Sequence, residues 1–267
     1  MTPDSRPAFD IVETAGFYSQ LAGVLAGFAF AAIMVLLTAR LIPSQRAAGG
    51  NSQFNSATRM LVVCFIGLVL ASLNYAVLAG DTPGKIRAAT LELVGGVGFA
   101  TAGLLLIYAM VLTFDDVSAV AQGNPADAVG DFLRSLLITV LTPLILLFIY
   151  LSVQDFNQIA HEKPGAEPIH EVSWLLIATQ ISLSTIDYLR HRKTTVTFAE
   201  RDRAVQSLAR TAIAAVVATS ILFAVLSAFL TSRSEPDPLE AIPYVAMVVS
   251  TIGAISFTHH LARTRPR

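Results

Sequence analysis

The chain has 267 residues, of which 54% are hydrophobic and only 14% are charged, whereas about a quarter of an ordinary soluble domain is charged. Its 18 basic and 19 acidic residues give a formal net charge of −1, so there is no basic field for nucleic acid. The hydrophobic residues gather in blocks close to the ~20 residues that cross a bilayer as a helix. The composition excludes an ordinary soluble globule and nucleic-acid binding, and it predicts an all-α integral membrane protein.

Seven apolar runs predict a single transmembrane domain with short loops and no soluble domain. The expected spans are 18–37, 60–78, 89–112, 133–151, 172–189, 211–230 and 241–260. The fifth run is interrupted by polar residues, so a bundle of six helices is the alternative. The connection 190–210 has room for a short interfacial helix at most.

Orientation follows from the distribution of arginine and lysine, which favour the cytoplasmic side. Seven spans with the N-terminus outside place thirteen basic residues on the cytoplasmic side and five outside. Six spans with the N-terminus inside give the same division. Aromatic residues at both ends of the fifth run, Trp174 and Tyr188, favour seven spans. We therefore predict a multi-pass protein of the cell (inner) membrane with a cytoplasmic C-terminus and an external N-terminus.

Glu92 is the clearest ionisable residue inside a predicted span, about one turn into the third helix. Asn74, near the outer end of the second helix, is its expected neighbour. Charges at membrane depth are costly and usually face the bundle interior or water. Glu92 is therefore either a proton or cation carrier, or an interfacial carboxylate that contacts water or Asn74.

A polar stripe is predicted on the fifth helix, where Gln180, Ser184, Asp187 and His191 recur at helical spacing. This stripe has two interpretations. It lines an aqueous path, or it seals a buried hydrogen-bond network between helices.

Small residues predict close helix packing at Gly23 and Gly27 in the first span and at Gly96 and Gly103 in the third. The packing partner is a helix of the same chain or of a second protomer. In the fourth span Pro143 lacks the N–H that would bond a preceding carbonyl, which predicts a kink that is either a packing bend or a hinge.

Basic residues concentrate between the fifth and sixth spans, where they predict contact with anionic lipid or an acidic partner. They are Arg190, Arg192, Lys193, Arg201, Arg203 and Arg210.

No nucleotide-binding, zinc-protease or serine-hydrolase motif occurs, and Cys64 is the only cysteine. We expect no catalytic residues, no metal and no cofactor.

Two functions remain. The first is a non-catalytic sensor, scaffold or accessory subunit with a basic cytoplasmic loop, in contact with the lipid bilayer and with a second copy or a membrane partner subunit. The alternative is a small proton- or cation-coupled transporter or channel that uses Glu92 and the polar stripe. The lack of an internal repeat of the transporter kind favours the first.

Overall fold

The computed structural model describes residues 11–39, 53–81, 86–120, 126–161, 168–191, 196–232 and 241–264. This described part is almost entirely helical and contains no β-strand. Its elements are α1 (Ile11–Ala39), α3 (Gln53–Leu78), α4 (Ile86–Val120), α5 (Ala126–Leu136), η1 (Leu137–Leu141), α6 (Thr142–His161), α7 (Pro168–His191), α8 (Phe198–Thr231) and α9 (Ala241–Arg263). Because α5, η1 and α6 follow one another without a break, the described residues contain seven helices long and apolar enough to cross a membrane.

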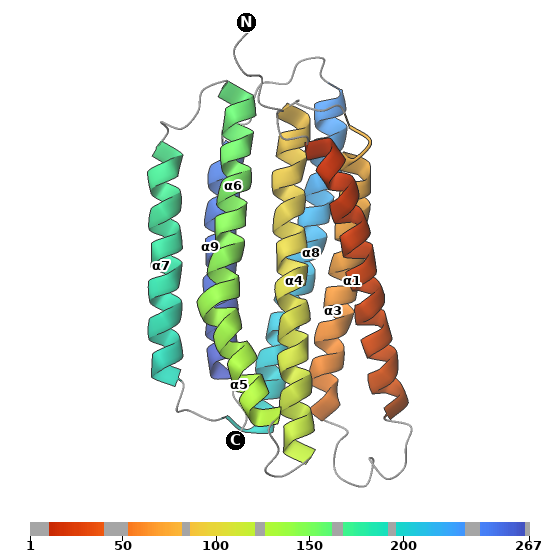
Figure 1. Cartoon of the computed structure of the whole chain (residues 1–267), viewed down its shortest axis with the longest axis vertical. Coiled ribbons are helices and arrows are strands. Elements are labelled where there is room, and N and C mark those ends of the chain that lie inside the picture. The colour runs from red at the N-terminus through yellow and green to blue at the C-terminus, as the bar shows by residue number, and fades with distance from the viewer. Residues whose placement is uncertain are drawn as a thin grey trace, which may run out of the picture.

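The prediction of seven long apolar helices is confirmed for the described residues. The fifth apolar run, the weakest in the sequence, forms the 24-residue helix α7. It lies alongside the other long helices in Figure 1. All seven predicted runs are therefore long helices among the described residues.

Helix α8 corrects the prediction that 190–210 is mainly a loop, because it begins at Phe198. Thr197 caps it: the Thr197 hydroxyl accepts a hydrogen bond from the Glu200 N–H at 3.4 Å, and the Glu200 carboxylate accepts one from the Thr197 N–H at 3.0 Å. This reciprocal capping box is a strong helix start. Most of the basic segment is thus the first turns of a long helix.

The long helices form two groups (Figure 1). Helices α1, α3, α4 and α8 pack together, and α6, α7 and α9 form the second group. Helix α4 contacts both groups, whereas α8 and α9 touch each other only sparsely. The bundle therefore has a seam between α8 and α9, with α4 and α6 behind it.

The four glycines predicted to mediate close packing differ in their surroundings. A Cβ built at Gly23 or Gly96 would lie 3.5 Å or 3.7 Å from a polar side chain of α3. At Gly27 and Gly103 a Cβ would meet nothing within 4 Å, so these two glycines do not mediate close packing within the described part of the chain. A tighter approach, not predicted, is at Gly67, where a Cβ would be 3.0 Å from an alanine Cβ of α4.

At the position of the kink predicted for Pro143, the structure has the π-helical segment η1, which ends two residues before the proline. The Thr142 N–H and its hydroxyl both donate to the Leu137 carbonyl, the hydroxyl at 2.7 Å. The widened turn thereby accommodates the missing proline donor. In Figure 1, α5 leaves the line of α6 at this point.

Candidate binding cavity and surrounding polar groups

A cavity of about 210 Å³ lies in the seam, roughly halfway along the bundle. Its floor consists of buried side chains of α4 and α6, such as Leu105 and Leu146, which are 2% and 1% exposed. Its mouth is formed by exposed positions of α8 and α9, among them Ala215 and Gly253. The cavity therefore opens sideways between α8 and α9, not toward either end of the bundle.

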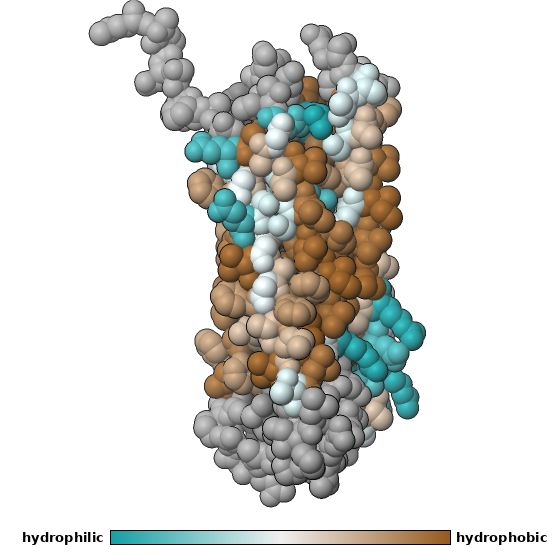
Figure 2. Space-filling model, turned by 90° about the vertical axis from the view of Figure 1, so that its right-hand side faces the viewer, coloured by the Kyte–Doolittle hydropathy of each residue, from teal (hydrophilic) through white to brown (hydrophobic). Residues whose placement is uncertain are grey.

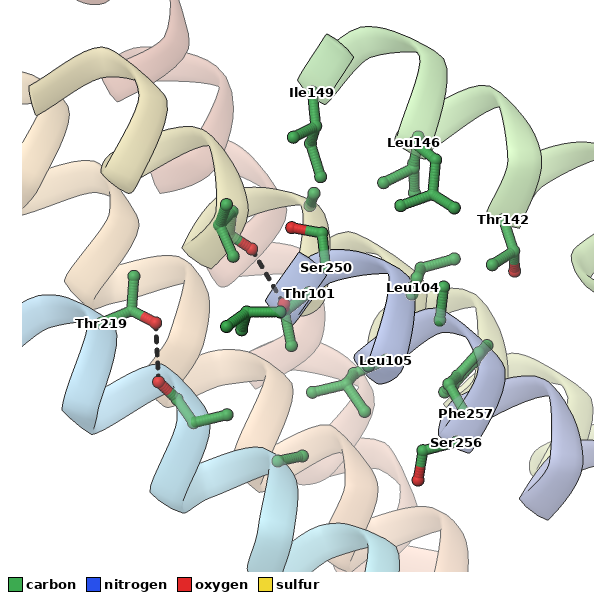
Figure 3. Close-up of a pocket in the computed structure, with 18 of the residues that line it drawn as sticks. Thr101, Leu104, Leu105, Thr142, Leu146, Ile149, Thr219, Ser250, Ser256 and Phe257 are labelled. Carbon is green, nitrogen blue, oxygen red and sulfur yellow. Dashed lines mark hydrogen bonds between the residues drawn. The ribbon is translucent and has the colours of Figure 1, made fainter. Parts of the chain in front are cut away.

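Most of the cavity wall is apolar, and hydroxyl groups are its polar component (Figure 3). The hydroxyl residues are Thr101, Thr142, Thr211, Thr219, Ser250 and Ser256. All four threonine hydroxyls donate to backbone carbonyls of their own helical segment, for example Thr219 to Ala215 at 2.8 Å. Their protons are therefore already used, and they offer a ligand only acceptor lone pairs.

Ser250 differs from these threonines. Its Oγ is buried and has no hydrogen-bond partner among the described residues. Figure 3 shows Ser250 on α9, beside Thr101 of α4. An unpaired buried hydroxyl costs about 1–3 kcal/mol, so it marks the place where a polar group of a ligand gains most.

Glu92 lies beyond one end of this cavity. Its carboxylate accepts a hydrogen bond from the Ser152 hydroxyl of α6 at 3.1 Å. Ser152 is one turn from Ile149, which lines the cavity. The expected neighbour Asn74 donates instead to Ser220 of α8 at 3.3 Å, so the predicted pairing of Asn74 with Glu92 is wrong.

The polar stripe of α7 packs against α9. Gln180 donates to Ser184 at 3.0 Å, and the Ser184 and Thr258 hydroxyls are 2.7 Å apart. At the lower end Asp187 lies between His191 and His259, at 3.0 Å and 2.9 Å. These contacts correspond to the interpretation as a network between helices.

Glu92 and the stripe are not joined in the structure. An apolar cluster lies among α4, α6, α7 and α9, with Leu93, Ile149, Ile177 and Met247 among its buried members. None of the hydrogen bonds among the described residues links Glu92 to Gln180 or Ser184. The two groups therefore do not form one polar path.

A buried charge cluster at the lower end was not predicted from the sequence. Asp115 of α4 accepts from Arg134 at 2.7 Å and from Arg201 at 3.4 Å. All three side chains are at most 6% exposed. Gly130 permits this approach, since a Cβ there would be 2.9 Å from the Asp115 Oδ1. Arg201 is thus an internal ion-pair residue, and its prediction as a surface contact is wrong.

The other basic residues of the segment behave differently. Arg190, Arg203 and Arg210 are exposed and remain available for a contact with lipid or a partner. Arg192 and Lys193 lie outside the described residues.

Signals for the missed features were present in the sequence. Threonine and serine recur within the otherwise apolar runs of the sixth and seventh spans, and the segments 113–134 and 190–210, beyond the apolar runs, carry charges of both signs. Which of these residues contact one another depends on the order of the helices around the bundle. The sequence of one apolar run does not indicate that order.

Comparison of the chain with known proteins finds no matching family model, no matching curated protein and no matching solved structure. What the chain does is therefore inferred from its own geometry.

Proposed function

We propose that the chain is a multi-pass protein of the cell membrane that acts as a non-catalytic sensor, scaffold or accessory subunit. In this role it binds an apolar chain, such as a lipid acyl chain, in the cavity between α8 and α9. The observation that supports this proposal is the sideways opening of a mostly apolar cavity, in which Ser250 has the one buried hydroxyl without a hydrogen-bond partner among the described residues.

Membrane placement is supported by the seven apolar helices among the described residues and by the distribution of basic residues between the two ends of the bundle. Helix directions alternate, so the connections on the side of the C-terminus hold thirteen of the 18 basic residues by sequence position. The positive-inside rule then orients the C-terminus to the cytoplasm and the N-terminus outside. In that placement the mouth of the cavity faces the hydrocarbon core.

The size and lining of the cavity favour a chain over a compact ligand. Its 210 Å³ is below the roughly 300–1,000 Å³ of typical small-molecule pockets, so part of the occupant stays outside in the bilayer. Lipid tails are as apolar as leucine, so entry gains packing contacts and little hydrophobic transfer energy. Selectivity then depends on shape and on a polar group, such as an ester or hydroxyl, that reaches Ser250.

The test uses the full chain in membranes that contain a fatty acid with a photoreactive diazirine in mid-chain. After illumination, mass spectrometry maps the labelled residues. We expect label on the buried floor, at Leu105 and Leu146, which a lipid on the outer surface does not reach. Label confined to outward-facing residues would contradict the proposal.

Matched glycine variants sharpen this test. Gly253→Leu places a side chain in the mouth, where a Cβ meets nothing within 4 Å, and is expected to remove most floor labelling. Gly27→Leu is the control, because that glycine is equally open but lies on α1, away from the cavity. Equal labelling in the two variants would refute entry through the α8–α9 mouth.

A proton or cation carrier is the second candidate, and the observation that favours it is Glu92. Its one hydrogen-bond donor among the described residues is Ser152, which is one turn from the cavity-lining Ile149. Flux into liposomes containing the purified protein tests it. Glu92→Gln should abolish flux if Glu92 carries the ion. If the wild-type protein shows no flux, this candidate is rejected and the binding proposal is unaffected.

A further inference from the structure

We infer that a groove between α3 and α8 binds the phosphate group of an anionic phospholipid from the cytoplasmic leaflet. The groove encloses about 380 Å³ near the lower end of the bundle. Thr58, Arg59, Gln206 and Arg210 provide its polar lining, and Val62, Val63 and Ile213 are among its apolar residues. Figure 2 shows hydrophilic side chains near both ends of this face, one group of them at the lower right, with mainly hydrophobic side chains between.

The net charge of the groove favours an anionic phosphate group as its occupant. The Arg59 Nη1 lies 3.1 Å from the Asp202 Oδ1, and the Ser56 hydroxyl donates to the same oxygen at 2.8 Å. This contact fixes Arg59 at the groove and balances its charge. Arg210 is exposed and forms no ion pair within the described residues. The groove thus carries about one uncompensated positive charge, which matches the single negative charge of a phosphodiester.

The hydrogen-bond donors of the groove also suit a phosphate group. Arginine forms paired hydrogen bonds to phosphate oxygens, and the Gln206 amide between the two arginines supplies further donors. A phosphate in the groove would therefore be bound by three side chains from two helices. A single exposed arginine offers only a diffuse attraction.

The depth to which the groove extends along the bundle favours a phospholipid over a free phosphate. Arg210 is eight residues beyond Asp202 on α8, about 12 Å further toward the middle of the bundle. Its long side chain can lie along the helix with the charged group at the interface. Val62, 39% exposed, and Ile213 continue the groove upward as an apolar wall. This wall suits the acyl chains attached to the phosphate.

The experiment follows the thermal unfolding of the full chain in an uncharged detergent while dioleoyl-phosphatidylglycerol is added. A lipid that binds only the folded state raises the unfolding temperature in proportion to its affinity. We expect phosphatidylglycerol to raise it more than dioleoyl-phosphatidylcholine does. Arg210→Gln should weaken the apparent affinity about fivefold, which corresponds to ~1 kcal/mol for a basic residue at an anionic leaflet.

Arg203→Gln is the matched control, since it removes the same charge from an exposed position of the same helix that does not line the groove. It should retain the full response to phosphatidylglycerol. Equal losses in the two variants, or equal effects of the two lipids, would overturn the site and leave only general attraction to anionic surfaces. Stabilisation by inorganic phosphate alone, equal to that by the lipid, would overturn the role of the apolar wall.

This site is independent of the cavity proposal, although it shares the proposed membrane placement. The groove lies between α3 and α8, whereas the cavity opens between α8 and α9. Gly253→Leu should therefore leave the phosphatidylglycerol response unchanged, so failure of one proposal is distinguishable from failure of the other.

Discussion

Replacement of Asp115 by Asn tests the buried charge cluster at the lower end of the bundle. The substitution keeps the size of the side chain and removes its charge. In the wild type the Asp115 Oδ2 is 2.7 Å from Arg134 and 3.4 Å from Arg201, and both arginine side chains are 3% exposed. The variant therefore leaves two buried guanidinium groups without their shared carboxylate.

The expected loss of stability follows from the burial of these three side chains. Removing one partner of a buried ion pair costs about 3–5 kcal/mol, because the remaining charge is left uncompensated. Arg134 keeps a second contact with Asp131 at 3.5 Å, so we expect the lower part of this range. A loss of ~3 kcal/mol corresponds to about a hundredfold change in the unfolding equilibrium. Reversible unfolding in mixed micelles, with rising dodecyl sulfate, measures it.

Two comparisons decide whether the reasoning is correct. Asp131→Asn removes a carboxylate that is 42% exposed and should cost only about 0–1 kcal/mol. The double variant Asp115→Asn with Arg201→Gln should lose less stability than the sum of the single losses, because one unpaired charge is then absent. Equal costs for the two aspartate variants, or strict additivity, would refute a buried cluster.

Three further predictions concern packing, the π-helix and topology. Gly67→Ala should destabilise the fold by about 1–3 kcal/mol in the same unfolding assay, since the added Cβ would lie 3.0 Å from that of Ala102, whereas Gly103→Ala, with open space, should not. Thr142→Val removes the buried bond to the Leu137 carbonyl and should cost ~1 kcal/mol; no loss of stability would show that η1 does not need this hydroxyl. Cysteines added at the two termini of a chain with Cys64 replaced should react from opposite sides of the membrane, and reaction from the same side would reject the seven-span arrangement.

The apolar runs predicted the number and order of the long helices but not their ends. Hydropathy falls where α8 begins, yet Thr197 and Glu200 cap it and Asp202 pairs with Arg59 of α3. Polar residues at the end of a long helix lower its hydropathy and at the same time fix it to its neighbours. A prediction from hydropathy averaged over neighbouring residues therefore omits the polar end of such a helix.

The candidate site could be predicted only in part, because it depends on which helices are neighbours. Helical spacing correctly grouped Gln180, Ser184 and Asp187 on the face of α7 that meets α9. Glu92 was paired with Asn74 because both lie toward the outer ends of neighbouring predicted spans, whereas its partner is Ser152 on α6. The cavity was missed because its walls come from four helices, none of which is unusual alone.

The two helix groups also constrain how the bundle is assembled during synthesis. Helices α1, α3 and α4 precede α8 in the chain by the whole of α5, α6 and α7. Yet α8 packs against both α3 and α4: Cβ atoms built at Gly67 and Gly98 would lie 3.5 Å and 3.4 Å from α8 side chains. These small-residue faces stay uncovered until the sixth long helix of the described chain has emerged from the ribosome. A nascent chain arrested before α8 should therefore remain bound to the insertion machinery, whereas one arrested after it can release its first group of helices into the bilayer.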